Sequence, residues 1–235
     1  MPPKPCPPTQ AIVLAAGRGE RLRPLTDRLP KPLVSVGGQS LLDHHLHGLR
    51  RAGITHCVIN IAHLGALIEA HVGDGSRFGL KISFSREPGG ALETGGGIKS
   101  ALPLLAAQPF IVVNADIFCD FDFASLCFRP PNIGHLVLVE NPPHHPHGDF
   151  ALDGEQITNE PTPRYTFSGI AAYDPKFFEL APAAARFPLA PMLRQSAARG
   201  AMTGQLFRGR WFDIGTAARL AAARLSGSSE SKKFI

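Results

Sequence analysis

The amino-acid sequence predicts an α/β protein with a mostly parallel central sheet flanked by helices. Short apolar runs alternate with stretches of helical periodicity through the first half of the 235 residues. Hydrophobic residues make up 44% of the chain and charged residues 18%, a composition that supports a packed core and excludes global disorder. The apolar runs are far shorter than the roughly 20 residues of a membrane-spanning helix, so a membrane protein is not expected.

The elements of the first half follow one another regularly. One helix is predicted between the N-cap Ser40 and the stop signal Gly53, and two more at residues 64–72 and from about Thr94 onward. Strands are predicted where apolar residues run together or alternate, at residues 11–14, 57–61, 80–84 and 110–113. Strands and helices in this order form βαβ units, which give the sheet its parallel part.

The second half contains more strand signals. Asp153-Gly154 separates two short strand-like stretches and predicts a hairpin. Further strands are predicted at residues 136–139, 165–173, 205–207 and 211–212, the last two pairing around Gly209, and helices at 189–199 and 216–225. We expect one domain at residues 11–225, after a mobile Pro-rich leader at 1–10 and before a polar tail at 226–235.

Cysteine spacing and charge exclude several classes of function. The cysteines lie far apart without a CxxC pair, so we expect reduced thiols of a cytoplasmic protein rather than a zinc site or disulfides; they are Cys6, Cys57, Cys119 and Cys127. The first residues contain no apolar segment that would act as a secretory signal. The net charge is +5, and no basic block is interleaved with aromatic residues, so nucleic acid is not an expected partner.

The loop after the first predicted strand has the features of a phosphate-binding site. In an open parallel sheet, ligands bind at the carboxyl ends of the strands, where this loop lies. Gly17 and Gly19 let backbone N–H groups approach a phosphate, and Arg18 and Arg21 can neutralise its charge. The spacing matches neither the dinucleotide-binding nor the Walker A pattern, and a tight turn with solvated arginines is the alternative.

A lysine between two prolines lies further along this loop. In Pro30-Lys31-Pro32 each proline fixes its own φ angle, and the residue before a proline is pushed toward an extended conformation. We therefore expect Lys31 to be held on a rigid, extended segment as a positioned phosphate ligand.

Residues 14–21, 24–26 and 30–33 together resemble the signature of the sugar-1-phosphate nucleotidylyltransferases, and the resemblance extends from residue 11 to about residue 225. It implies a Rossmann-like nucleotidyltransferase fold with a β-rich, sugar-binding second half. It also implies Mg²⁺ as cofactor and two small-molecule substrates, a nucleoside triphosphate and a sugar 1-phosphate, which react to an NDP-sugar and pyrophosphate. The left-handed β-helix of larger members is missing, so acetyl transfer is not expected.

The resemblance assigns roles to the first loop and to a second Gly-rich segment, residues 93–97. Lys31, Arg21 and Arg18 are the expected catalytic cations, because they neutralise the phosphates and no residue needs to become a covalent nucleophile. The glycines of the second segment are expected to leave room for the flat base. The expected nucleotide-binding residues are Leu14, Ala15, Gly17, Gly19, Glu20, Arg21, Lys31, Thr94, Gly95 and Gly96.

Two aspartates at predicted strand ends are the metal ligands that the resemblance implies. Asp116 follows the strand at residues 110–113, and Asp213 lies in residues 211–216, which are similar to the family's second metal-binding motif. Mg²⁺ prefers one or two carboxylates together with phosphate oxygens. Either aspartate alone is also compatible with an ordinary N-cap or turn residue.

Sugar recognition is assigned by the same resemblance to Asn114, Asp149 and Gly169. Many family members carry a lysine in a Glu-Lys-Pro segment that contacts the sugar phosphate, but residues 159–162 contain none. We expect Arg28, Arg164 or the metal ion to take its place.

Several other side chains receive structural interpretations. A zinc site is considered for His135, His144, His145 and His147, but a loop at the rim of the substrate site is the preferred interpretation of the histidines around Pro146. Packing is the preferred interpretation for Asn60 and His63, and a core position for Trp211.

Within the family, residues 92–98 and 141–150 resemble bacterial uridylyltransferases that use UTP and N-acetylmuramic acid 1-phosphate and supply UDP-MurNAc in peptidoglycan recycling of the cell wall. The alternatives are a mannose-1-phosphate guanylyltransferase or another sugar-1-phosphate nucleotidylyltransferase. From another class, a catalytically silent NDP-sugar sensor would not need Lys31 or the aspartate pair. The sequence does not decide the oligomeric state, and a monomer is the working expectation.

Overall fold

The computed structural model describes residues 8–126, 130–160, 163–183 and 185–228. Most of the expected leader, the last residues of the expected tail, Cys6, Cys127 and residues 161–162 lie outside these ranges. The helices are α1 (Leu41–Arg51), α2 (Gly65–Val72), α3 (Glu93–Ala101), α4 (Ala190–Ala198) and α5 (Ala217–Ser228). The strands are β1 (Gln10–Leu14), β2 (Ser35–Val36), β3 (Gln39–Ser40), β4 (His56–Ile61), β5 (Lys81–Arg86), β6 (Phe110–Asn114), β7 (Ile117–Cys119), β8 (Gly134–Val139), β9 (Phe150–Asp153), β10 (Gln156–Thr158), β11 (Arg164–Tyr173), β12 (Met202–Phe207) and β13 (Trp211–Asp213).

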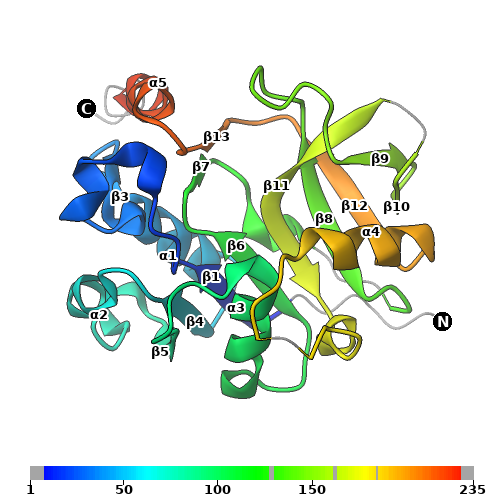
Figure 1. Ribbon diagram of the computed structural model, residues 1–235, viewed down its shortest axis with the longest axis horizontal. Coiled ribbons are helices and arrows are strands. Elements are labelled where there is room, and N and C mark those ends of the chain that lie inside the picture. The colour runs from blue at the N-terminus through cyan, green and yellow to red at the C-terminus, as the bar shows by residue number, and fades with distance from the viewer. Residues whose placement is uncertain (1–7, 127–129, 161–162, 184, 229–235) are drawn as a thin grey trace.

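A nine-stranded sheet with the order β5-β4-β1-β6-β11-β8-β12-β10-β9 runs through the molecule (Figure 1). The strands β5, β4, β1 and β6 are parallel, as the alternation of strands and helices predicts. The strand β11 is antiparallel to both β6 and β8, and β9 and β10 form the predicted hairpin. The sheet is therefore parallel in the first half and mixed in the second.

The predicted pairing around Gly209 is wrong. The strand β12 lies between β8 and β10 in the large sheet, whereas β13 pairs antiparallel with β7, a short strand that we did not predict. The loop between β12 and β13 contacts Asp120, whose carboxylate accepts the Arg210 N–H at 2.8 Å. A Cβ on Gly209 would overlap the Phe207 ring, so glycine permits the chain to cross from one sheet to the other here.

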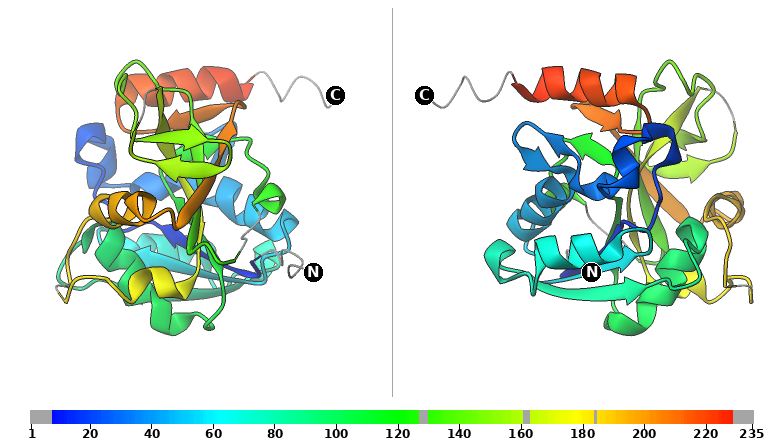
Figure 2. Two further views of the ribbon diagram at one scale, coloured as in Figure 1. Left: turned by 90° about the vertical axis from the view of Figure 1, so that its right-hand side faces the viewer. Right: turned by 60° about the vertical axis from the view of Figure 1, so that its left-hand side comes forward.

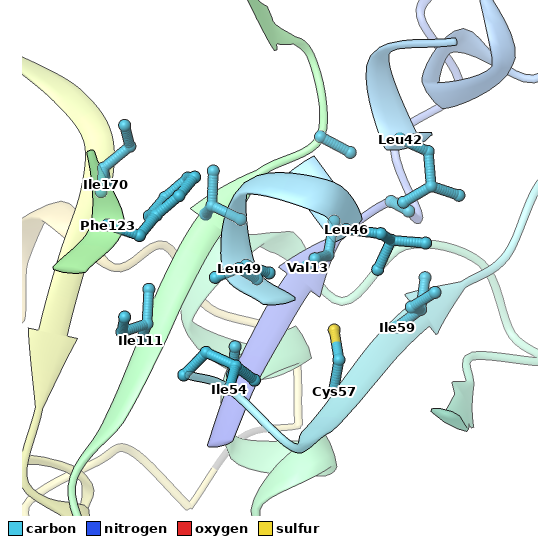
Figure 3. Packing of buried hydrophobic residues seen from close by; sticks show 14 of the residues in the cluster. Val13, Leu42, Leu46, Leu49, Ile54, Cys57, Ile59, Ile111, Phe123 and Ile170 are labelled. Atoms are coloured by element: carbon cyan, nitrogen blue, oxygen red, sulfur yellow. The ribbon is translucent and has the colours of Figure 1, made fainter. Parts of the chain in front are cut away.

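The helix α1 covers one face of the parallel part of the sheet. Its leucines pack on side chains from β1, β4 and β6, among them Val13, Ile59 and Ile111 (Figure 3). The Ser40 hydroxyl accepts the Asp43 N–H at 3.0 Å and so caps the helix, as predicted. Full burial of such side chains stabilises the fold by about 1.5–3 kcal/mol each. In the same layer, burial raises the pKa of the Cys57 thiol to about 12, which keeps it protonated.

The helix α5 packs over the segment that follows the first loop (Figure 2). Leu220 and Ala223 of α5 join Leu22, Val34 and Leu41 in one buried cluster. The chain's last described element therefore lies beside one of its first loops. Secondary structure extends beyond the expected domain, residues 11–225, at both ends. The strand β1 begins at Gln10 and the helix α5 ends at Ser228.

None of the helices within the described ranges combines the length and the apolar character that crossing a bilayer requires.

Candidate active site

Two pockets meet at the carboxyl end of β6. The first, the loop pocket, is lined by residues 14–17 and 19 of the first loop and by the start of α3. The second, the β11 pocket, is lined by residues 166–169 of β11 and by side chains of β13 and α5. Both pockets include Asn114 and Asp116 in their walls, so they form two compartments of one cleft.

The first loop exposes its backbone to the loop pocket, as predicted. Open space surrounds the Cα of Gly17, so a ligand can approach the main chain there. Gly19 has a φ of +68°, and a Cβ at this position would lie 3.2 Å from the Lys31 Cβ. Its carbonyl accepts the Thr26 hydroxyl at 2.9 Å. Gly19 is thus required both by the turn and by the close passage of the lysine stem.

The backbone at Lys31 differs from the extended segment that was expected. Lys31 begins a 3-10 turn (Lys31–Leu33) and is not part of an extended segment. Its ammonium donates to Asp116 Oδ2 at 2.6 Å, and its side chain is only 11% exposed. The cation is therefore fixed where the two pockets meet, by its buried stem and by a charge-assisted hydrogen bond.

Two polar side chains, Asn60 and Glu87, connect the walls of the loop pocket. From the sequence, Asn60 was assigned to packing and Glu87 received no role. Asn60, at the end of β4, accepts the Ala15 N–H at 2.6 Å and donates to Glu87 Oε1 at 2.8 Å. Glu87 Oε2 accepts the Leu92 N–H at 2.7 Å, and both side chains are 3% exposed. The signal in the sequence was their place at the end of one predicted strand, residues 57–61, and shortly after another, residues 80–84.

The three glycines of the second Gly-rich segment have another role than the one expected. They lie within α3 and are buried, and Gly95 and Gly96 do not line the loop pocket, although Thr94 does. A Cβ on Gly95 would overlap the Phe187 ring, and one on Gly96 would overlap the Ala185 carbonyl. The small size of Gly95 and Gly96 lets α3 approach residues 185–187, and Gly97 makes room for the Asn60 and Glu87 side chains, so these glycines serve packing.

Asp116 and Asp213 lie on neighbouring segments and both line the β11 pocket. The strand β13 pairs with β7, and the Ile214 N–H donates to the Asp116 carbonyl at 2.8 Å. Asp213 accepts from Arg219 Nη1, and His144 Nε2 lies 3.2 Å from its other oxygen. The carboxyl side chains are 36% and 29% exposed.

This donor set fits Mg²⁺, which takes one or two carboxylates and completes its shell with phosphate oxygens and water. Within the described ranges, no three His, Cys, Asp or Glu side chains are arranged to hold a metal ion by themselves.

The wall of the β11 pocket is built around an irregularity in the strand. The pairing of β11 with β8 shifts register between Phe167 and Ile170, and Gly169 has a φ of +80°. A Cβ on Gly169 would lie 2.6 Å from Asn114 Nδ2, so glycine lets these two expected sugar-binding residues meet. Trp211 is partly buried against the hydrophobic core, and it also donates its indole N–H to the Ser168 carbonyl at 3.0 Å and lines this pocket, which the core assignment did not include.

Asp149 does not line either pocket and instead supports the wall. Its Oδ2 accepts the Phe167 N–H at 2.8 Å, and His145 Nε2 lies 3.1 Å from its Oδ1. His144 and His145 do line the β11 pocket, as expected of a loop at the substrate rim.

The predicted cations separate into two groups. Arg21 lines the β11 pocket, together with Arg219, which sequence reasoning missed. Arg18 and Arg28 are exposed and lie outside both pockets, as does Glu20. Arg164 lies 3.8 Å from Glu160 and also stays outside. Arg219 was missed because it lies outside the recognised motif, six residues after Asp213. It belongs to a helix whose sequence carries no signal of a binding site.

Residues 10–228 match the family described as Nucleotidyl transferase. An N-acetylmuramate alpha-1-phosphate uridylyltransferase of Neisseria meningitidis serogroup B is 47% identical over 92% of this chain and 96% of its own length. An enzyme of the same name from Caulobacter vibrioides is 34% identical over 93% of this chain and 98% of its own length.

More distant proteins share the fold. A mannose-1-phosphate guanyltransferase beta-A of Xenopus laevis is 30% identical over 88% of this chain and 61% of its own length. The solved structure of the inositol-1-phosphate CTP transferase from T. maritima superimposes with a TM-score of 0.77 at 17% identity, covering 98% of this chain and 99% of its own.

Proposed function

The chain belongs to the nucleotidyl transferase family, and on that premise we propose that it transfers the uridylyl group of UTP to N-acetylmuramic acid 1-phosphate, giving UDP-MurNAc and pyrophosphate. The observation that carries the proposal is the joined pair of pockets, one for each substrate, with Asn114 and Asp116 in both walls. The choice of substrates is supported by the two uridylyltransferases that match nearly the whole chain.

The loop pocket is the proposed site of UTP. The backbone around Gly17 faces the triphosphate, and Thr94 with the segment before α3 faces the base. The Asn60–Glu87 hydrogen bonds hold these two walls at a fixed separation. A pyrimidine needs less depth than a purine, which is consistent with UTP as donor.

The β11 pocket is the proposed site of the sugar phosphate. Its phosphate oxygen attacks the α-phosphorus of UTP in line, and pyrophosphate leaves on the opposite side. Because the attacking phosphate is already an anion at neutral pH, no protein nucleophile is required. Lys31 neutralises charge where the pockets meet, and Arg21 does so at the edge of the β11 pocket. Mg²⁺ held by Asp116 and Asp213 would supply further charge neutralisation on the phosphates.

In the cell, we infer that this reaction belongs to the cytoplasm and to the recovery of cell-wall sugars. The described cysteines, Cys57 and Cys119, are free thiols, as in a reducing compartment. A catalytically silent sensor of NDP-sugars is disfavoured. Binding alone would not require the buried Lys31 paired with Asp116, nor the neighbouring Asp213.

Pyrophosphate release with UTP and with GTP, each against a panel of sugar 1-phosphates, tests this proposal. We expect the highest kcat/KM for UTP with N-acetylmuramic acid 1-phosphate, and UDP-MurNAc as the product by mass. Faster turnover of GTP with mannose 1-phosphate would replace the proposal by the guanylyltransferase alternative.

A further inference from the structure

Two arginines from opposite ends of the chain meet in the β11 pocket. Arg21 belongs to a 3-10 turn (Glu20–Leu22) after β1, and Arg219 to the first turn of α5. The residues next to them, Leu22 and Leu220, are buried in the same hydrophobic cluster. The packing of α5 on the first loop therefore fixes the two arginines beside each other.

A glycine makes room for both guanidinium groups. A Cβ on Gly215 would overlap the guanidinium of Arg219 and would lie 3.0 Å from Arg21 Nη2. Both cations thus occupy the space directly above this one backbone position. With any other residue at position 215, the guanidinium groups would have to shift away from the Cβ.

The two arginines bring two positive charges to this point, and one of them pairs with a carboxylate. Arg219 pairs with Asp213, and its Nη1 also lies 2.7 Å from His144 Nε2. Within the described ranges the Arg21 guanidinium has no acceptor. Two adjacent guanidinium groups repel each other unless an anion lies between or beside them, and their planar forks suit carboxylate and phosphate oxygens.

The position of the pair assigns it to the acceptor substrate. Both arginines line the β11 pocket, whereas Lys31 lines the loop pocket. An acceptor in the β11 pocket must bring its phosphate to the shared wall at Asp116 in order to attack UTP. Arg219, through Asp213 and the Ile214–Asp116 hydrogen bond, is anchored next to this wall.

We propose that Arg219 is a substrate-binding residue that, with Arg21, binds an oxyanion of the acceptor sugar 1-phosphate. If the oxyanion is the phosphate, Arg219 supplies the positive charge for which residues 159–162 contain no lysine. The inference rests on the proposed function, since it requires an acceptor in the β11 pocket. In N-acetylmuramic acid 1-phosphate the oxyanion is either the phosphate or the lactyl carboxylate, and both present the same chemistry to a guanidinium.

The test compares Arg219→Gln and Arg219→Lys with the wild type. Initial rates give KM for the acceptor, KM for UTP and the Mg²⁺ concentration for half-maximal rate. Arg208→Gln is the matched control, because Arg208 also pairs with a carboxylate, Glu140 at 2.7 Å, but lies outside both pockets. Thermal melting confirms that each variant is folded, and the lysine variant keeps the test open if the glutamine variant does not fold.

We expect Arg219→Gln to raise KM for the acceptor by about tenfold or more, because it removes a charge-assisted hydrogen bond. KM for UTP and the Mg²⁺ requirement stay near their wild-type values, Arg219→Lys falls in between, and Arg208→Gln behaves as wild type. An unchanged acceptor KM with a lower kcat or a higher Mg²⁺ requirement would overturn the inference, since Arg219 would then act only by orienting Asp213.

N-Acetylglucosamine 1-phosphate, which has the phosphate but no lactyl group, identifies the oxyanion. An equal loss on both acceptors assigns Arg219 to the phosphate, and a loss confined to N-acetylmuramic acid 1-phosphate assigns it to the carboxylate. If the wild type uses another sugar 1-phosphate instead, the proposed function fails. The inference is then judged by the same KM comparison with that sugar phosphate.

Discussion

Each aspartate of the cleft has a cation beside it, Lys31 at Asp116 and Arg219 at Asp213. Such pairing orients the carboxylates without burying them, so their removal changes the chemistry of the cleft more than the stability of the core. The motif residues Gly17, Lys31, Asp116 and Asp213 were predicted because each lies in a contiguous stretch of recognisable sequence.

Asp116→Asn and Asp213→Asn are each expected to lower turnover by about a hundredfold or more, because an amide keeps the shape of the carboxylate but binds Mg²⁺ poorly. Melting temperatures should stay near that of the wild type. Asp120→Asn is the control, since Asp120 follows β7 close by but lies outside both pockets. Near-normal turnover of both variants at saturating Mg²⁺ would remove them from the metal site.

Lys31→Met should lower turnover by about a hundredfold, because the methionine keeps the buried stem and removes the charge proposed to neutralise the phosphates. Lys99→Met is the control: Lys99 donates to the Pro182 carbonyl at 2.6 Å but lies outside the cleft. Turnover and circular-dichroism melting, measured on the same samples, separate the two effects. A large loss of stability with full activity per folded molecule would show that Lys31 is structural.

At the scale of elements, strands and helices with clear periodicity were predicted to within a few residues, whereas β7 was not predicted and β13 was predicted with the wrong partner. A strand as short as β7 has no periodicity to detect, so the pairing of β13 with it could not be predicted either. In helix α3, three successive glycines disfavour a helix, but close packing requires them: Gly95 and Gly96 lie against residues 185–187, and Gly97 lies against Asn60 and Glu87. The Asn60–Glu87 contact was not predictable for a similar reason, because it joins the ends of separate strands.

Glu87→Gln tests whether this contact holds the loop pocket in shape. The glutamate accepts two hydrogen bonds, from Asn60 and from the Leu92 N–H, and a glutamine would place an NH₂ group against one of these donors. We expect a loss of about 1–3 kcal/mol in stability and a higher KM for UTP. Glu69→Gln, in an exposed ion pair with Arg86, serves as the control. An unchanged melting temperature and KM would contradict the role of Glu87.

His45 on α1 makes the stability of the helix layer depend on pH. Burial, the largest cause, lowers the pKa of His45 from 6.5 to about 4. The unfolded chain therefore binds a proton that the native state does not bind, and stability falls as the pH decreases from about 6.5 toward 4. Urea denaturation should show a loss of about 2 kcal/mol between pH 7 and pH 5 that His45→Leu does not show. Equal pH slopes in both proteins would contradict this account.

At the scale of the whole molecule, the cleft lies where the parallel first half meets the mixed second half, and β6 is the strand at which they join. The order of elements could be predicted from the sequence. The meeting of α5 with the first loop could not, because Arg21 and Arg219 are far apart along the chain and only the packed cluster around Leu22 and Leu220 brings them together. The acceptor side of the cleft was accordingly the less predictable side.

A crystal structure with UDP-MurNAc and Mn²⁺ in place of Mg²⁺ tests the central claim, that transfer takes place where the two pockets share Asn114 and Asp116. The account predicts the uracil in the loop pocket and the sugar in the β11 pocket. The diphosphate then crosses the shared wall, and the anomalous Mn²⁺ peak lies beside both Asp116 and Asp213. A nucleotide bound outside the loop pocket, or a Mn²⁺ peak away from both aspartates, would contradict it.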